Sequence, residues 1–370
     1  MKKVTLNKLF LSIVVSLVLG GFLIFISASL GLLAGSSGAN FYNVVIKQFL
    51  VGIIGGGLAF LFFSNLHYRH LRRYAIYIFT ATLLLTAAVI IPGVGTAHGG
   101  AVRWLDIGGF SLQPSELLKI GFVIYIATWL SGAYTDVKSW KHGLLPFVIV
   151  VGLTGGVMMA QPDTDTFLLM AASGMAMLLT SGARWRDMAL IIVAGLLVLS
   201  AFALKYPYML NRLHTFQNPT ADLHGGGWQV EQARLAIGSG GVSGKGFGQS
   251  IQKFKYLPEP IGDSIFAVFG EEFGYVGTSL LIFLFTAFTF IGYKIATRTK
   301  DKFGMFLVVG FTTLIFLQAF LNIGSMTRTI PLFGLTLPFV SHGGTSLLVT
   351  LIMAGIIYNV AKNSPQSKRS

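Results

Sequence analysis

The sequence predicts an all-α polytopic membrane protein with ten transmembrane helices. Of the 370 residues, 54% are hydrophobic and only 11% are charged, whereas soluble domains have about 45–50% and about 25%. Apolar segments also recur at the length of about 20 residues that a helix needs to span a bilayer. So few charges cannot cover a surface that faces mostly water. The chain has no cysteine, which excludes disulfides, thiolate metal sites and thiol catalysis.

Ten apolar segments qualify as spanning helices. In chain order they cover residues 9–34, 42–63, 75–92, 114–131, 143–160, 166–181, 188–204, 264–292, 303–323 and 343–361. The first contains Ser27-Ala28-Ser29 and follows two lysines, as a cleavable signal peptide does. Its apolar run is much longer than the usual signal core of about 7–15 residues, so we expect a retained helix. Composition shows no second domain, and residues 1–370 are expected to form one membrane domain.

Basic residues predict the orientation, because cytoplasmic loops are enriched in Lys and Arg. With the N-terminus inside, the inner segments hold 17 of the 27 cations and three of the 13 acids. The cations are Lys2, Lys3, Lys8, Arg69, Arg72, Arg73, Lys138, Lys141, Arg184, Arg186, Lys294, Arg298, Lys300, Lys302, Lys362, Lys368 and Arg369, and the acids are Asp136, Asp187 and Asp301. The rest of the chain has no net charge. The total of +14 therefore indicates two cytoplasmic termini, and no nucleic-acid partner.

A long extracytoplasmic loop of 59 residues, 205–263, connects the seventh and eighth helices. A loop of this length is typical of a functional segment. Its glycine run, 238–248, resembles a phosphate-binding loop, but Gly246 follows Lys245 where a Walker motif has Ser or Thr. A closely packed or flexible loop is the favoured interpretation. Binding of a lipid-carried diphosphate by successive N–H groups is the alternative.

Ionisable residues inside or at the rim of the bilayer are the candidate functional groups, because burying a charge there is costly. Arg103 and Trp104 precede the fourth helix, whose first turn carries Glu116. Lys119 lies three residues further on, so the two side chains share a helix face and can pair. They form either a structural ion pair or one wall of a polar cavity open to the outside.

Further acids lie at two helix starts. Asp163 or Thr164 can cap the sixth helix, and capping is also the preferred interpretation of Asp165; the two carboxylates are a weak signal for a divalent cation. Asp263 precedes the eighth helix, where an N-cap is the default role of Asp. Glu271 and Glu272 lie two turns deeper and are expected to pair or to carry protons.

The irregular segment between the last two helices, residues 322–346, is a further candidate for the site. Arg328, Ser341 and His342 lie in it. Irregular backbone at membrane depth lines a cavity or is buried in protein. A lone His such as His342 is more often a structural residue than a base.

Taken together, these segments resemble the SEDS family (shape, elongation, division and sporulation), which includes FtsW and RodA. The matching segments lie in order over about two thirds of the chain. They are Arg103-Trp104, Gln113-Pro114-Ser115-Glu116 with Lys119, Gln161-Pro162-Asp163, the glycine run, Leu257-Pro258-Glu259 with Asp263, Gly270-Glu271-Glu272-Phe273-Gly274, and Pro331 to Ser346. The stretch 248–253 is closer to the FtsW branch than to RodA.

The sequence also departs from the family pattern. Asp165 stands where Gly is usual, His342 where Tyr is common, Ser264 where Phe is common, and Lys255 where many relatives carry an acid or polar residue. None of these changes removes Asp263. The charge or metal balance around Asp165 is the feature that they alter.

The resemblance implies a peptidoglycan glycosyltransferase of the bacterial cytoplasmic membrane that polymerises lipid II on the outer leaflet. Its expected partners are a class B penicillin-binding protein, which crosslinks the product, and other division or elongation proteins. In this reaction a sugar 4-hydroxyl attacks the anomeric carbon of a lipid diphosphate, with inversion. Asp263 is the candidate general base, while Glu116, Asp163, Glu259, Ser341, His342 and Trp104 are candidate substrate-binding residues.

The leaving diphosphate requires countercharge. Candidates are Arg103, Lys119, Lys253, Arg328, glycine N–H groups or a divalent cation such as Mg²⁺ or Mn²⁺, and the sequence does not choose among them. Two other functions compete with the enzyme: a flippase or transporter of a lipid-linked precursor, which also needs intramembrane charges, and a non-catalytic division scaffold. Both would tolerate substitutions of Asp263 that polymerisation would not.

Overall fold

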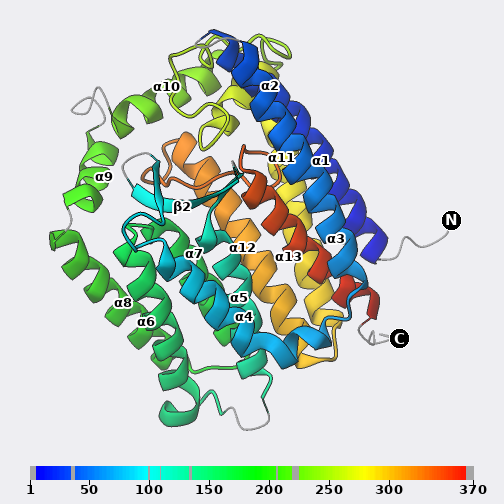
Figure 1. The fold of residues 1–370 in the computed structure, drawn as a ribbon, viewed down its shortest axis with the longest axis vertical. Helices are drawn as coiled ribbons and strands as arrows, with labels where there is room; N and C mark the ends of the chain where they lie inside the picture. Colours follow the sequence, from blue (N-terminus) through cyan, green and yellow to red (C-terminus); the bar gives the residue numbers. More distant parts are fainter. Residues whose placement is uncertain are drawn as a thin grey trace.

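A computed structural model describes residues 6–34, 38–98, 101–108, 110–132, 136–205, 207–218 and 225–363, and within them the chain is mainly helical (Figure 1). Each predicted apolar segment is helical. The corresponding helices are α1 (Leu6–Ser29), continued by the short η1 (Leu30–Ala34); the composite of α2 (Gly38–Lys47), η2 (Gln48–Gly55) and α3 (Gly56–Asn65); α4 (Arg69–Ala88); α5 (Pro114–Leu130); α6 (Leu145–Ala160), preceded by η3 (Trp140–Leu144); α7 (Thr164–Thr180); α8 (Trp185–Lys205); α11 (Ile265–Arg298); α12 (Lys302–Met326); and α13 (Gly344–Asn363).

The composite segment of α2, η2 and α3 packs closely against α13. Its middle part, η2, is a π-helix, a form that is usually short and frequent at functional sites. Gly52 and Gly56 lie against α13, where an added Cβ would come within 2.8 Å of Leu347 and 2.6 Å of Leu351. Small residues at such contacts let two helix backbones approach closely in a membrane.

The chain is mainly helical, as expected, but one region that the sequence analysis did not predict forms strands. A three-stranded antiparallel sheet, β1 (Thr96–His98), β2 (Ala101–Ile107) and β3 (Phe110–Leu112), lies between α4 and α5. Gly108 turns β2 into β3 with a positive φ of 62°, which Gly adopts without steric cost. Arg103 and Trp104 are therefore on a strand. The long loop that was expected over residues 205–263 also contains two helices, α9 (Pro207–Gln217) and α10 (Gly226–Ser239).

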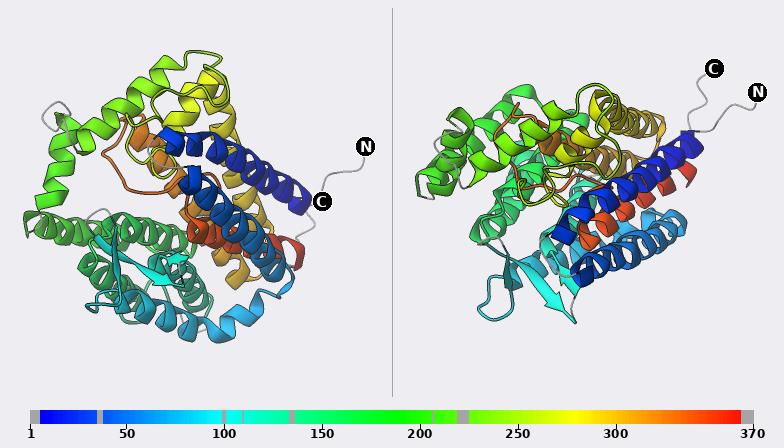
Figure 2. Two further views of the ribbon diagram at one scale, coloured as in Figure 1. Left: turned by 45° about the horizontal axis from the view of Figure 1, so that its top comes forward. Right: turned by 90° about the horizontal axis from the view of Figure 1, so that it is seen from above.

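The helices form a bundle with α12 and α13 at its centre. In their apolar stretches 72% and 78% of the residues are buried, against 6% in α8, which lies at the edge (Figures 1 and 2). Six helical segments in the described ranges are both long and apolar enough to span a bilayer: 6–33, 40–65, 185–204, 265–298, 302–326 and 344–363.

Different parts of the chain lie at the two ends of the bundle. The first turn of α1 and the last turn of α13 lie at one end, whereas α10 lies at the opposite end (Figure 1). A close backbone contact also joins α1 to the segment that precedes α13. Gly21 in α1 lies directly against the Phe339 carbonyl of the segment that precedes α13, with no space for a Cβ.

Candidate functional site

Asp263 lies in the turn before α11, and its side chain does not cap that helix. The N-cap position belongs to Ser264, and no side-chain cap bond forms there. The Asp263 backbone carbonyl accepts a hydrogen bond from Asn322 Nδ2 at 2.7 Å, and the same amide donates to the Leu335 carbonyl at 2.7 Å. Asn322 thus fixes the Asp263 backbone to the segment before α13 and leaves the carboxyl for another role.

Three charged side chains lie around Gly334. A Cβ added at Gly334 would lie 3.5 Å from Asp263 Oδ2, 3.7 Å from Asp165 Oδ2 and 3.9 Å from Arg212 Nη2. These groups come from the turn before α11, the first turn of α7 and the middle of α9. The site is therefore assembled from segments that are distant in the sequence.

Asp165 does not cap α7, contrary to the sequence-based expectation. The N-cap is Asp163, whose side chain accepts a long hydrogen bond of 3.5 Å from the Thr166 amide. Asp165 instead accepts hydrogen bonds from Arg212 Nη1 at 2.7 and 2.9 Å, and from the Gly334 amide at 3.0 Å. Its carboxylate thus points from the helix into the site.

The environment of Asp263 raises the pKa of its carboxyl to about 7. The largest cause is desolvation by burial, followed by the negative charges of Glu259 and Asp165, while Arg212 and Arg103 oppose the rise. Burial disfavours the charged form of a carboxyl, and like charges add to the effect. A carboxyl with this pKa can accept a proton near neutral pH.

Arg103 holds the turn between α6 and α7. Its guanidinium donates to the carbonyl of Gln161 at 3.2 Å and to that of Pro162, and it lies 3.8 Å from Asp163 Oδ1. Asp163 also accepts from the Ser115 hydroxyl at 3.1 Å. Trp104, next to Arg103 on β2, is half-buried, and its carbonyl accepts from Thr96 Oγ1 at 3.2 Å.

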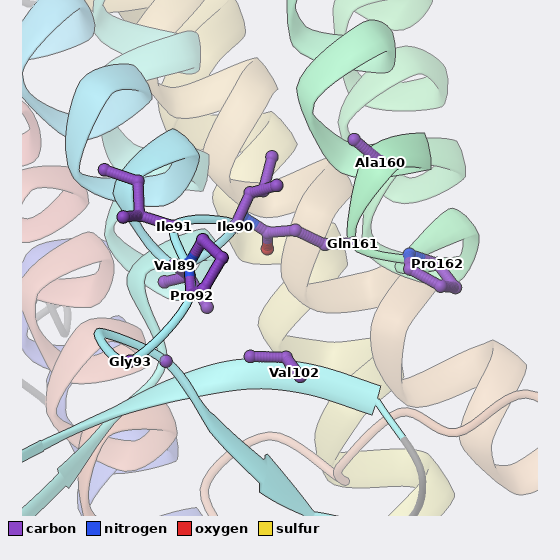
Figure 3. A pocket seen from close by; sticks show the side chains of 10 residues that line it. Val89, Ile90, Ile91, Pro92, Gly93, Val102, Ala160, Gln161 and Pro162 are labelled. Atoms are coloured by element: carbon purple, nitrogen blue, oxygen red, sulfur yellow. The ribbon is translucent and has the colours of Figure 1, made fainter.

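An apolar pocket of about 460 Å³ lies beside this turn, on the side of Gln161 and Pro162 (Figure 3). The end of α4 and the turn after it form one wall, Val102 of β2 forms another, and Ala160, Gln161 and Pro162 close it. Most of the lining is aliphatic, which suits a hydrocarbon group.

Glu116 and Lys119 form the expected pair. Their side chains meet at 2.8 Å, both are buried, and Lys119 also donates to Gln318 Oε1 of α12 at 3.0 Å. Gln318 in turn donates to the Thr336 carbonyl at 2.9 Å. The pair thus joins α5 through α12 to the segment that carries Gly334, and its contacts are those of a structural support.

Ser341 and His342 fix the turn that precedes Asp263. Ser341 Oγ donates to the Gly262 carbonyl at 2.7 Å and accepts from the Leu337 amide at 2.8 Å, while the His342 amide donates to the Ile261 carbonyl at 2.7 Å. Burial lowers the pKa of His342 to about 4, so its ring is neutral at physiological pH. Both residues act on Asp263 through the backbone.

Two ion pairs account for the acids inside α11. Lys245 reaches Glu271 at 2.6 Å, and Lys253 reaches Glu272 at 2.7 Å. The expectation that these acids pair is confirmed. Because the Lys253 side chain has no exposed surface, it cannot contact a ligand in this structure, which argues against direct diphosphate binding.

The glycine run packs against α11 and does not form an anion site. Its Lys245 and Gly246 amides donate to the carbonyls of Glu271 and Glu272 at 3.0 and 2.9 Å. Glycine is required because a Cβ at Gly244 would overlap the Glu272 carbonyl. The closely packed interpretation therefore holds for this loop.

The remaining candidates are nearer the solvent. Glu259 is exposed and Arg328 is half-buried, and both have positive φ. Asp163 and Asp165 bind different partners and do not share a ligand position. Within the described ranges no three His, Asp or Glu side chains gather in a way that would hold a metal ion.

Known proteins resemble this chain in sequence and in fold. The family model for FtsW, RodA and SpoVE, described as "Cell cycle protein", matches residues 7–366. The chain belongs to the FtsW/RodA/SpoVE family.

Relatives of the family agree with this assignment. Stage V sporulation protein E of Bacillus subtilis is 37% identical over 312 residues, which are 84% of each chain. A probable peptidoglycan glycosyltransferase FtsW of Geobacter metallireducens is 37% identical over 315 residues, 85% of this chain and 84% of the relative.

Solved structures of this family extend the comparison to the fold. The crystal structure of the rod shape determining protein RodA of Thermus thermophilus has 25% identity and a TM-score of 0.69, over 97% of each chain. A chain from a structure described as the coordination of polymerization and crosslinking by a peptidoglycan synthase complex has 25% identity and a TM-score of 0.75. It covers 92% of this chain and 96% of that one.

Within this family fold, the structure also shows what sequence reasoning missed. Arg212 and Gly334 were not among the expected site residues, although both contact Asp165. One signal was available: Asp165 stands at a usual Gly position, and a buried carboxylate needs a cation or hydrogen-bond donors.

Proposed function

We propose that this protein is a peptidoglycan glycosyltransferase that polymerises lipid II, with Asp263 as its general base. The observation that carries the proposal is the position of the Asp263 carboxyl, which shares the surroundings of Gly334 with Asp165 and Arg212; its pKa there is raised to about 7. Family membership and the names of the FtsW relatives support the reaction class.

The chemistry needs one base. A sugar 4-hydroxyl of one glycan attacks the anomeric carbon of a lipid-linked donor, its C–O bond forms as the bond to diphosphate breaks, and Asp263 accepts the hydroxyl proton. Diphosphate leaves without a proton, unlike the leaving group in most glycoside hydrolases, which use a second carboxyl as acid. A base works best when its pKa lies near the working pH.

Arginine side chains supply the countercharge in this proposal. Arg212 and Arg103 lie close enough to Asp263 to influence its pKa. Arg328 is a further cation, at the start of the segment between α12 and α13. Lys119 and Lys253 contribute indirectly, by holding α5 and α11 in place. The aliphatic pocket beside Arg103 suits part of a lipid chain.

The proposal includes a location. We place ten spans across the bacterial cytoplasmic membrane with both termini in the cytoplasm and Asp263 at the outer face. The expected partner is a class B penicillin-binding protein, as the similarity to a chain of a peptidoglycan synthase complex suggests, together with other division or elongation proteins.

The test is polymerisation of purified lipid II by the Asp263→Asn variant, with and without the partner transpeptidase. Removal of a general base costs about 100-fold or more in rate, so glycan strands should disappear while the protein remains folded. Glu231→Gln, a half-exposed acid on α10, is the matched control and should stay active. Full activity of Asp263→Asn would refute the assignment, and lipid II movement across vesicles without polymerisation would favour a flippase.

A further inference from the structure

Asp165 joins three segments at the site. The Arg212 guanidinium on α9 contacts both its oxygens, at 2.7 and 2.9 Å, and the Gly334 amide donates to Oδ2 at 3.0 Å. The Asp165 side chain is only 5% exposed, and that of Arg212 is 31% exposed. This ion pair therefore ties helix α9 of the outer loop to the first turn of α7.

The same pair lies near the Asp263 carboxyl. Asp263 Oδ2, Asp165 Oδ2 and Arg212 Nη2 all lie within 4 Å of the point where Gly334 would carry a Cβ. Any side chain at position 334 would thus enter the space between them. The three groups thus surround one point beside the Gly334 backbone, and each would be in ordinary van der Waals contact with a Cβ there.

We propose that Asp165 and Arg212 are positioning residues for Asp263: their ion pair docks α9 over the site and sets the local charge beside the carboxyl of Asp263. The proposal rests on the proposed function for its catalytic meaning.

The pair has opposite effects that can be separated. Four charged groups face Asp263: Glu259 from its own turn, Asp165 from α7, Arg212 from α9 and Arg103 from β2. Glu259 and Asp165 favour the protonated carboxyl, whereas the two arginines favour the ionised form. Removing Asp165 or Arg212 should therefore move the titration of Asp263 in opposite directions.

The experiment measures that titration without relying on activity. The full-length protein is labelled at a series of pH values with a water-soluble carbodiimide and glycine methyl ester, which react with protonated carboxyls. Mass spectrometry of the Asp263 peptide gives the midpoint pH. Asp165→Asn keeps the side-chain size and an oxygen for the Gly334 amide, and Arg212→Gln removes only the cation.

We expect the midpoint to fall by about one pH unit in Asp165→Asn and to rise by about one unit in Arg212→Gln. Arg212→Lys, which keeps the charge, should remain near the parent protein, and the double variant Asp165→Asn/Arg212→Gln should lie between the single variants. Arg234→Gln removes a 55% exposed arginine of α10 and should leave the midpoint unchanged.

The pH profile of lipid II polymerisation provides the second readout. Its acid limb should shift in the same directions as the labelling midpoints, because Asp263 must be ionised to accept a proton. A purely structural pair would lower activity at every pH without moving the limb in two directions. Midpoints that do not move, or that move in the same direction in both single variants, would overturn the positioning role.

Failure of this inference can be told from failure of the proposed function. If Asp263→Asn keeps full polymerisation activity, the proposed base is wrong, whatever the labelling shows. If Asp263→Asn is inactive and the midpoints stay fixed, Asp263 remains the base and only the role of Asp165 and Arg212 is lost.

Discussion

At the scale of single residues, the acids in α11 and in the turn before it fall into two groups with different consequences. Glu271 and Glu272 each meet a lysine at 2.6 and 2.7 Å, so their charge is balanced locally. Asp263 has arginines nearby, but the negative Glu259 and Asp165 and its burial outweigh them and raise its pKa to about 7. Perturbation of this kind is typical of functional groups, whereas balanced pairs are typical of structural ones.

The buried pair gives a prediction about Lys253. Lys253→Met leaves the Glu272 carboxylate, which is 2% exposed, without its cation, and breaking a buried pair in this way costs about 3–5 kcal/mol. We expect a large fall in melting temperature in detergent. Lys253→Met/Glu272→Gln, which removes both charges, should recover most of it.

The ion pair of Lys245 and Glu271 provides the control for this prediction. Lys245→Met removes the cation from Glu271, but the Lys245 side chain is 33% exposed and Glu271 keeps hydrogen bonds from the Ser250 hydroxyl and the Gln252 amide. Its loss should be smaller. If Lys253→Met keeps the parent melting temperature but raises the KM for lipid II, Lys253 binds substrate and the structural role is wrong.

At the scale of elements, α11 depends on a break at Gly274. This residue has φ 62° and ψ −158°, a conformation essentially restricted to Gly. Beyond the break, the Tyr275 and Val276 amides donate to the carbonyls of Gly241 and Val242 at 2.9 and 3.1 Å. The glycine run thus replaces the helical partners that α11 loses, and it binds the α11 backbone on both sides of the break.

Gly274→Ala should therefore be far more harmful than an ordinary helix substitution. A Cβ at this position would lie 2.7 Å from the Val242 carbonyl oxygen and 2.8 Å from that of Gly241, and the backbone would be strained as well. We expect loss of folded protein by size-exclusion chromatography. Gly195→Ala in α8, where a Cβ meets open space, should be tolerated; equal stability of the two variants would contradict the proposed role of the break.

The helices were predictable from the sequence, whereas the strands and the contacts between distant segments were not. The apolar segments were predicted because hydrophobicity over about 20 residues is a local property, and each is helical in the structure. The three-stranded sheet was missed because two of its strands have only three residues. The ion pair of Asp165 and Arg212 spans 47 residues of sequence, and the contact of Asp165 with Gly334 spans 169.

Asp263 could be selected from sequence because a carboxylate before an apolar helix is visible in the chain. Its default interpretation as an N-cap was wrong, because capping is decided by geometry, and the position belongs to Ser264. Apart from Glu259 in its own turn, the charged groups that affect its pKa come from α7, α9 and β2. Only the folded chain brings those elements together.

At the scale of the whole molecule, the charge pattern and the position of the site lead to one orientation. The first turn of α1 and the last turn of α13 lie at one end of the bundle, opposite α10 (Figure 1). The excess of Lys and Arg in the segments assigned to the inner side predicts that this end faces the cytoplasm. We therefore expect Asp263 to face the outside, where the proposed substrate would be polymerised.

The absence of cysteine in the chain makes this orientation directly testable. Single cysteines are introduced at Tyr256, 54% exposed and seven residues before Asp263, and at Trp185, 73% exposed at the start of α8. A membrane-impermeant maleimide applied to spheroplasts should label Tyr256→Cys at once and Trp185→Cys only after permeabilisation. The opposite pattern would turn Asp263 toward the cytoplasm, and polymerisation on the outer leaflet by this site would then be untenable even if the purified protein extends lipid II.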